Sequence, residues 1–173
     1  GSPRAAGAEP LLRPTPLVLK DGRIANVSIH VLPFASGQAE LAAAPADAIE
    51  LHTERSLYRN IVVYDDDGLR CMKFGRHAAG RQTCMSLADR DRLVFDYTRM
   101  MMAALYLNPS PERVLIIGLG GGTLPGALQK ILPAAWIDAV EVDPAVVRVA
   151  GKYFGFAPGR QIAVFEEDGR VFV

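Results

Sequence analysis

A glycine cluster at residues 118–122 constrains this chain more than any other feature, because it follows a short apolar run and precedes a segment with helical spacing. Residues 113–117 end in continuous Val, Leu and Ile, which is typical of a strand buried on both faces. A glycine turn between such a strand and a helix lets a ligand approach bare backbone and the helix N-terminus. The alternative is a tight turn only, because Thr123 stands where the dinucleotide-binding fingerprint has its last glycine.

Strands and helices alternate after the glycine cluster. Residues 124–132 have helical spacing, residues 136–142 form a second apolar run, and residues 161–165 form a third. The helix between the second and third runs has a cap at Asp143, a proline at its first position and a stop at Gly155. This alternation predicts a parallel α/β sheet with strand order 3-2-1, half of a doubly wound Rossmann-like fold that stops after its third strand. The first strand would then have an uncovered edge.

The residues before this region have the pattern of strands and turns. One hairpin is expected over residues 17–32 around Asp21-Gly22, and a clearer one joins residues 60–64 to 69–74 through a turn at residues 65–68. A helix is predicted over residues 87–107, with its methionines filling the core. The predicted organisation is a disordered tail or tag at 1–16, a small antiparallel β domain at 17–84, and a C-terminally incomplete Rossmann-like nucleoside-binding domain at 85–173.

The charge and cysteine content limit the partners. Nineteen basic residues balance nineteen acidic ones, so nucleic acid and membrane surfaces are not expected partners. The longest apolar run, residues 100–107, is far shorter than the about 20 residues that cross a bilayer. Cys71 and Cys84 lack the spacing of a zinc or redox motif, so a reducing cytoplasm is expected and neither receives a function. The three histidines are scattered, and no metal is expected.

Two carboxylates follow the later strands. Glu141 closes the second strand, where its two oxygens can accept both hydroxyls of a ribose. Asp168 follows the third strand. Since neighbouring parallel strands end at one edge of a sheet, the glycines and both carboxylates should surround one crevice. For Asp168 a solvated acidic run is the alternative, because Glu166 and Glu167 stand beside it.

The stretch from residue 54 to residue 173 resembles the spermidine synthase family, the polyamine aminopropyltransferases. The resemblance rests on the blocks at residues 56–61, 91–100, 114–122, 140–143 and 168–169, together with Gln82; the last three blocks are shared with class I methyltransferases. Both groups bind S-adenosylmethionine or its decarboxylated form as group donor. The resemblance implies that Glu141 holds the ribose, that Asp168 holds the adenine amino group, and that the β domain contributes to homo-oligomer contacts. The implied nucleoside-binding residues are Gly118, Gly120, Gly121, Gly122, Glu141, Asp168, Gly169, Gln82 and Tyr97.

Three departures from the family pattern concern the donor. Gly121 stands where the family has an Asp that pairs with the ammonium group of the decarboxylated donor, and Thr98 and Arg59 each replace a Gln. An Asp would repel the carboxylate of intact S-adenosylmethionine, whereas a glycine N–H and a guanidinium can bind it. The departures therefore favour the ordinary methyl donor.

The resemblance predicts a transferase. The family's activity is aminopropyl transfer to a polyamine, with a small amine or another acceptor as the second substrate. The family's proton-accepting Asp follows a fourth strand, so no catalytic residue is named and the 173-residue chain is expected to be inactive alone. The alternatives are an S-adenosylmethionine-dependent methyltransferase, an NAD-dependent dehydrogenase, and a non-catalytic binding or assembly module.

Overall fold

A computed structural model of the chain describes residues 17–18, 24–25, 28–30, 48–75 and 80–173, so the predicted tail at 1–16 lies outside the described residues. The strands up to the glycine region are β1 (Leu17–Val18), β2 (Ile24–Ala25), β3 (Ser28–His30), β4 (Ile49–Arg55), β5 (Asn60–Asp66), β6 (Leu69–Phe74) and β7 (Arg81–Ser86). They are followed by α1 (Asp96–Met102), the 3-10 helix η1 (Ala103–Tyr106), β8 (Arg113–Ile117), α2 (Thr123–Ile131), β9 (Trp136–Glu141), α3 (Pro144–Phe154), β10 (Ile162–Glu166) and α4 (Gly169–Phe172).

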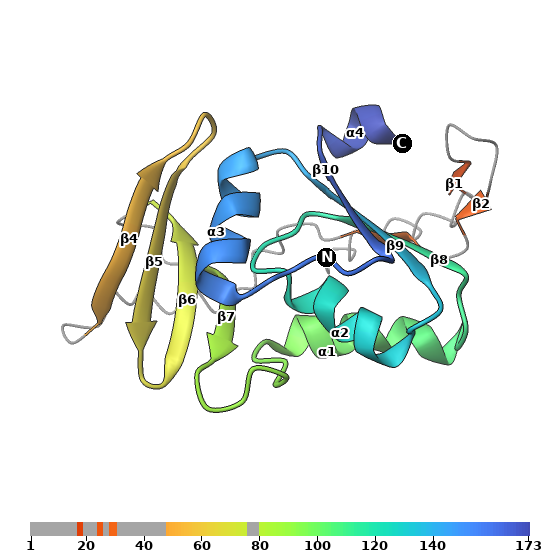
Figure 1. Cartoon of the computed structure of the whole chain (residues 1–173), viewed down its shortest axis with the longest axis horizontal. Coiled ribbons are helices and arrows are strands. Elements are labelled where there is room, and N and C mark those ends of the chain that lie inside the picture. The colour runs from red at the N-terminus through yellow and green to blue at the C-terminus, as the bar shows by residue number, and fades with distance from the viewer. Residues whose placement is uncertain (1–16, 19–23, 26–27, 31–47, 76–79) are drawn as a thin grey trace, which may run out of the picture.

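Strands β4 to β7 form an antiparallel sheet in sequence order (Figure 1). The predicted second hairpin is β5–β6, and its turn is shorter than expected because Asp65 and Asp66 continue the strand. Only Asp67 and Gly68 turn the chain, with φ of 45° and 71°. Positive φ at both positions is the signature of a type I′ turn, whose twist matches that of the two strands.

The second sheet is the predicted Rossmann-like one. Its order is β10-β9-β8-β3, so the parallel arrangement 3-2-1 of the three later strands is confirmed. The expectation of an uncovered first strand is wrong, because β3 pairs in parallel with residues 115–117 of β8. The same pairing takes β3 out of the antiparallel sheet, where the sequence places it, while β1 and β2 pair only with each other.

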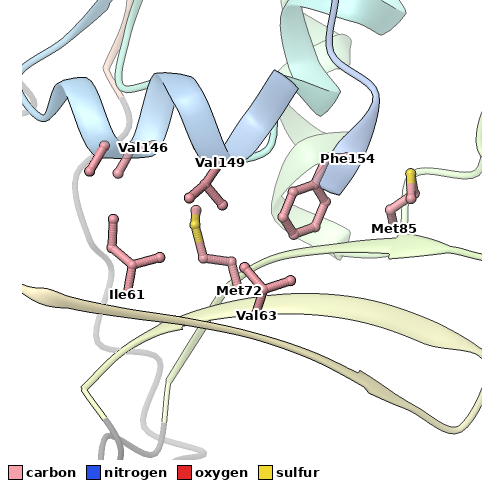
Figure 2. Close-up of a cluster of buried hydrophobic side chains, with 8 residues drawn as sticks. Ile61, Val63, Met72, Met85, Val146, Val149 and Phe154 are labelled. Atoms are coloured by element: carbon pink, nitrogen blue, oxygen red, sulfur yellow. The ribbon is translucent and has the colours of Figure 1, made fainter. Parts of the chain in front are cut away.

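Helix α3 lies between the two sheets and packs against both (Figure 1). Val146, Val149 and Phe154 project from α3 onto Ile61 and Met72 of the antiparallel sheet (Figure 2). On its other side, Ala150 packs against Ala139 of β9, and both residues have no exposed surface. Because its side chains pack against both sheets, α3 holds the antiparallel sheet over the carboxyl ends of the parallel strands.

The first helix begins later than the sequence predicts. Residues 87–95 form turns and a bridge between Leu93 and Met85, and only residues 96–106 are helical. Tertiary pairing with β7 therefore overrides the helical spacing in this segment. Met101 and Met102 pack beside the core, but Met100 is 74% exposed and is not core filler. Within the described residues, every helix is too short or too polar to span a bilayer.

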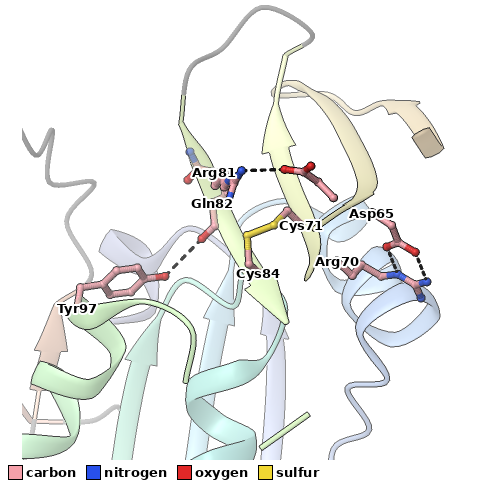
Figure 3. Close-up of a disulfide and its surroundings, with 8 residues drawn as sticks. Asp65, Arg70, Cys71, Arg81, Gln82, Cys84 and Tyr97 are labelled. Atoms are coloured by element: carbon pink, nitrogen blue, oxygen red, sulfur yellow. Dashed lines mark hydrogen bonds and ion pairs between the residues drawn. A yellow bond between two sulfur atoms is a disulfide. The ribbon is translucent and has the colours of Figure 1, made fainter. Parts of the chain in front are cut away.

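Cys71 and Cys84, to which the sequence analysis assigns no function, form a disulfide (Figure 3). The two residues face each other on β6 and β7, at directly paired positions. Spacing along the sequence does not reveal this, because the register of the two strands brings the sulfurs together. Disulfides persist in oxidising compartments and are rare in the cytoplasm, so the cysteines give no support to the cytoplasmic expectation.

Candidate functional site

A cavity of about 550 Å³ lies where the carboxyl ends of β8, β9 and β10 meet the antiparallel sheet. This volume is in the range of sites for small molecules and cofactors. Its walls include seven of the nine residues that the resemblance implies, namely Gly118, Gly120, Glu141, Asp168, Gly169, Gln82 and Tyr97. The structure therefore brings together residues separated by up to 87 positions (82 to 169).

Gly121 and Gly122, which the resemblance also implies for the nucleoside site, are not among the residues that border the cavity. A Cβ at Gly121 would lie 2.9 Å from Thr83 Oγ1 and 3.1 Å from the Phe154 ring, and one at Gly122 would lie 2.3 Å from the Phe156 ring. Both glycines therefore serve the close packing of the glycine loop, residues 118–122, against its neighbours. The part of this loop that borders the cavity is residues 118–120.

Glu141 joins the glycine loop to the start of α3. Its Oε2 accepts a hydrogen bond from the Leu119 N–H at 2.9 Å, and its Oε1 accepts one from the Asp143 N–H at 3.1 Å. An ionised carboxylate offers about four acceptor sites, so each oxygen keeps one for a ligand hydroxyl. The two backbone bonds hold the carboxylate in one orientation at the cavity wall.

Asp168 caps the short helix α4 at the neighbouring strand end. Its Oδ1 accepts from the Arg170 backbone N–H at 2.9 Å, and the Arg170 side chain donates to both carboxylate oxygens, with Nη2 to Oδ2 at 2.6 Å. These hydrogen bonds lower the pKa of Asp168 to about 2, so the carboxylate is ionised at neutral pH. Gly169 follows with its Cα against Ile117, where a Cβ would lie 2.6 Å from Cγ2.

Tyr97 and Gln82 meet at the side of the cavity nearest the disulfide (Figure 3). The Tyr97 hydroxyl donates to the Gln82 carbonyl across 3.4 Å, a long bond. Partial burial raises the pKa of the Tyr97 hydroxyl, so it stays protonated at neutral pH. Thr98 also lines the cavity, but its hydroxyl donates to the Phe95 carbonyl at 2.6 Å.

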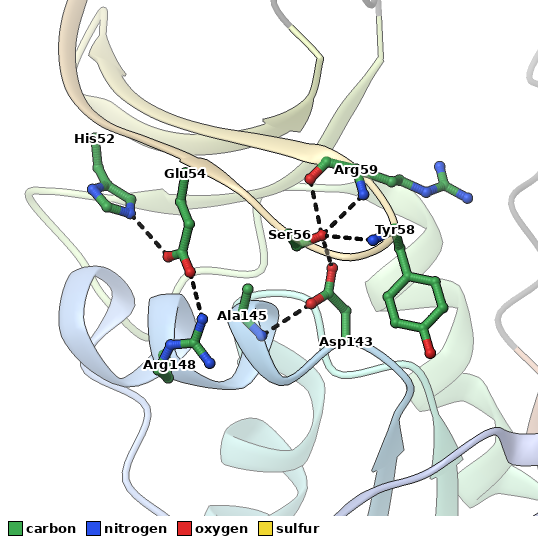
Figure 4. Close-up of polar contacts among 8 residues, drawn as sticks. All are labelled: His52, Glu54, Ser56, Tyr58, Arg59, Asp143, Ala145 and Arg148. Carbon is green, nitrogen blue, oxygen red and sulfur yellow. Dashed lines mark hydrogen bonds and ion pairs between the residues drawn. The ribbon is translucent and has the colours of Figure 1, made fainter.

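The turn between β4 and β5 contributes a wall that sequence spacing alone does not predict. Ser56 anchors this turn: its hydroxyl lies 2.5 Å from Asp143 Oδ2 and accepts from the N–H groups of Tyr58 and Arg59 at 3.1 and 2.9 Å (Figure 4). Tyr58 and Arg59 then border the cavity. Their block in the family resemblance, residues 56–61, was the only sign of this in the sequence.

Several other lining residues leave no sign in the sequence. Phe74 and Thr83 come from β6 and β7, and Val146 comes from the start of α3. Nothing in the local pattern separates them from ordinary strand or helix residues, because only the packing of α3 between the sheets brings them to the cavity.

The described part of the chain holds no group of three metal-ligating side chains. His52 lies away from the cavity, within 3.2 Å of Glu54 and stacked on Tyr153. Figure 4 shows Glu54 also bonded to Arg148 of α3, and these contacts lower the pKa of Glu54. The contacts of Glu54 with Arg148 join the antiparallel sheet to α3. His77 lies outside the described residues.

The chain is similar in sequence and in fold to known proteins, although no family model matches it. It is 41% identical over 143 residues to a polyamine aminopropyltransferase of Vibrio vulnificus, covering 82% of this chain and 45% of that protein. It is 35% identical over 92 residues to the human eEF1A lysine and N-terminal methyltransferase, covering 49% of this chain and 13% of that protein. The fold matches a probable spermidine synthase from Corynebacterium glutamicum with a TM-score of 0.57 at 17% identity, covering 69% of this chain and 45% of that one. The chain thus spans about half the length of the first curated relatives it matches.

Proposed function

Because this chain is a relative of the polyamine aminopropyltransferases, the spermidine synthase-like family, we propose that its cavity binds a sulfonium nucleoside derived from S-adenosylmethionine. In this proposal Glu141 accepts the ribose hydroxyls, Asp168 accepts the adenine amino group, and residues 118–120 pass beside the nucleoside. One observation carries the proposal: the ends of three successive strands place the glycine backbone and the carboxylates of Glu141 and Asp168 on the wall of one cavity of about 550 Å³.

For the whole protein we propose aminopropyl transfer to a polyamine. The amine nitrogen attacks the carbon next to the sulfonium, and the electrons of the breaking S–C bond go to sulfur, which leaves as a neutral thioether. The amine proton must pass to a base. The present chain supplies the donor site, and we propose that it binds the donor without transferring the group.

Methyl transfer from S-adenosylmethionine is the second candidate. It is supported by the similarity to a methyltransferase and by Arg59 on the cavity wall, which suits a carboxylate-bearing donor. A dehydrogenase is the weaker alternative, because Thr123 departs from the dinucleotide fingerprint. Thermal-shift measurements with NAD separate this class from both transferases.

The proposal is tested by changing Glu141 to Gln, which keeps the size of the side chain and removes its charge. Calorimetry with adenosine and with 2′,3′-dideoxyadenosine isolates the ribose contact. We expect adenosine to bind the unaltered chain at least about 10-fold more tightly than the dideoxy compound, since hydrogen bonds to a charged group contribute about 1.5–3 kcal/mol. Glu141→Gln should lose most of this difference in affinity.

The matched control is Glu167→Gln, which removes a nearby carboxylate that does not line the cavity and should leave the preference intact. An unchanged ribose preference in Glu141→Gln would contradict the assignment. Failure of the unaltered chain to bind any adenine nucleoside would instead favour a non-catalytic assembly module.

A further inference from the structure

Arg59 is a charged group on the cavity wall without an ionic partner among the described residues. Its guanidinium carbon lies 5.1 Å from the centre of the Phe74 ring, and Phe74 also borders the cavity. No carboxylate in the described part of the chain lies within ion-pair distance of it. By contrast, six other arginines pair with acidic side chains: Arg70, Arg81, Arg99, Arg113, Arg148 and Arg170.

The backbone of Arg59 is held firmly. Its carbonyl accepts from the Ser56 N–H at 2.8 Å, and its N–H donates to the Ser56 hydroxyl at 2.9 Å. Since that hydroxyl has a single proton, its 2.5 Å contact with the Asp143 carboxylate is the bond we assign to it, and the oxygen remains an acceptor for the turn. Figure 4 shows the Arg59 side chain directed away from Ser56 and Asp143. Ser56 and Asp143 therefore tie the turn that carries Arg59 to the end of the strand that carries Glu141.

The acidic groups around the cavity already have protein donors. Glu141 accepts two backbone N–H groups, Asp143 accepts the Ala145 N–H and the Ser56 hydroxyl, and Asp168 accepts from Arg170. The sequence analysis names the Gly121 N–H as a second group that can bind the donor carboxylate, but Gly121 is not among the residues that border the cavity. Arg59 is therefore the charged group left to recognise a charged part of the ligand.

We propose that Arg59 binds the carboxylate of the group donor, so that the site takes intact S-adenosylmethionine in preference to its decarboxylated form. This inference rests on the proposed nucleoside site, and it favours the second candidate, methyl transfer, because aminopropyl transfer uses the decarboxylated donor. A guanidinium over an aromatic ring can present its N–H groups to a carboxylate, to which an arginine can donate two parallel hydrogen bonds. The decarboxylated donor offers only an ammonium group at this end of the molecule, and the guanidinium repels it.

Three ligands separate the charges. S-adenosylmethionine has an α-carboxylate and an α-ammonium, the decarboxylated donor keeps only the ammonium, and 5′-methylthioadenosine has neither. Each is titrated calorimetrically into the unaltered chain and into Arg59→Gln, Arg59→Lys and Arg55→Gln. Arg55 is the control, because it is an exposed arginine of the same hairpin that does not line the cavity.

We expect the unaltered chain and Arg55→Gln to bind S-adenosylmethionine at least 10-fold more tightly than the decarboxylated donor. Arg59→Gln should weaken the binding of S-adenosylmethionine by about 10- to 100-fold. The affinity for 5′-methylthioadenosine should not change, and the affinity for the decarboxylated donor should stay the same or increase. Arg59→Lys should restore part of the loss, because it keeps the charge but not the paired donor edge.

Equal binding of the two donors, or tighter binding of the decarboxylated one, by the unaltered chain would overturn the proposal while leaving the nucleoside site intact. An equal loss for all three ligands in Arg59→Gln would also overturn it, because a collapsed turn would have that effect. If 5′-methylthioadenosine itself fails to bind the unaltered chain, the proposed function fails and this inference falls with it.

Discussion

Asp168 and Arg170 show how two residues separated only by Gly169 determine the charge of one part of the cavity wall. Arg170 donates to Asp168 through its backbone and its side chain, and the resulting fall in the Asp168 pKa to about 2 needs no contact from elsewhere in the fold. A carboxylate with so low a pKa accepts hydrogen bonds well but is a weak general base. Its position suits recognition of a donor group better than proton removal.

Changing Arg170 to Ala should raise the pKa of Asp168 from about 2 toward its ordinary 3.8. Because the folded-state pKa is depressed, the Asp168 contacts stabilise the fold above the ordinary pKa and are lost as the pH falls from about 4 to about 2. In the variant this pH dependence should largely disappear. Titration of the Asp168 carboxyl carbon by NMR measures both values. Arg160→Ala is the control, and an unchanged Asp168 pKa in Arg170→Ala would contradict the prediction.

The site residues differ in how far the sequence could predict them. Gly118, Glu141 and Asp168 follow apolar strands directly, so their common position at one sheet edge follows from local pattern and parallel topology. Gly121 has the same local context, yet it faces Thr83 and Phe154. The direction in which a loop residue points depends on its neighbours in space, and these come from β7 and the end of α3.

Among the elements, α3 combines a local signal with a tertiary one. Its cap is local: Asp143 Oδ1 accepts from the Ala145 N–H at 3.0 Å, and Gly155 ends the helix with φ of 68°. The other oxygen of the same carboxylate binds Ser56, 87 residues earlier in the sequence. Asp143 is only 4% exposed, so it both begins α3 and attaches the β4–β5 turn.

Two variants should separate these roles. Ser56→Ala keeps the cap but removes the bond to the Asp143 carboxylate and the acceptor of two N–H groups of the turn, so we expect a loss of about 1.5–3 kcal/mol in the free energy of unfolding. Asp143→Ala removes the bond to Ser56 and the cap, and it should cost about 2–5 kcal/mol, because loss of an N-cap adds about 0.5–2 kcal/mol. Urea denaturation measures both as a lower midpoint with an unchanged slope. A smaller loss in Asp143→Ala than in Ser56→Ala would contradict the prediction.

The first helix shows the opposite balance of local and tertiary signals. Residues 87–95 have helical spacing, but the bridge from Leu93 to Met85 draws them against β7, and Val94 and Phe95 pack on the core that contains the disulfide. Spacing predicts a helix only where no neighbouring strand competes for the same residues. The helical part therefore begins at Asp96.

At the scale of the whole molecule, the two sheets enclose a cavity, and no described residue on its wall is an evident base for the proposed transfer. The three carboxylates of the cavity wall all accept hydrogen bonds from protein groups. An amine with a pKa near 10 needs a base to become a nucleophile at neutral pH, and in the proposed complex these carboxylates are engaged by protein donors or by the nucleoside.

We therefore expect the 173-residue chain to bind donor and transfer nothing. Mass spectrometry should detect neither 5′-methylthioadenosine, the product of aminopropyl transfer, nor S-adenosylhomocysteine, the product of methyl transfer, above a protein-free control. The assay is run with polyamine and protein acceptors, and nucleoside binding by the same sample shows that the site is folded. Release of either product in the presence of an acceptor would contradict the prediction.

The sequence by itself determined the three parallel strands, the glycine loop and the carboxylates at the strand ends, because apolar runs, glycines and helix caps act over a few neighbouring residues. Only the tertiary structure decided that β3 covers β8, that Cys71 meets Cys84, and that Phe74 and Thr83 reach the cavity. These outcomes depend on strand register and on the packing of α3 between two sheets. Both bring together residues far apart in the chain, and no local pattern encodes such distances.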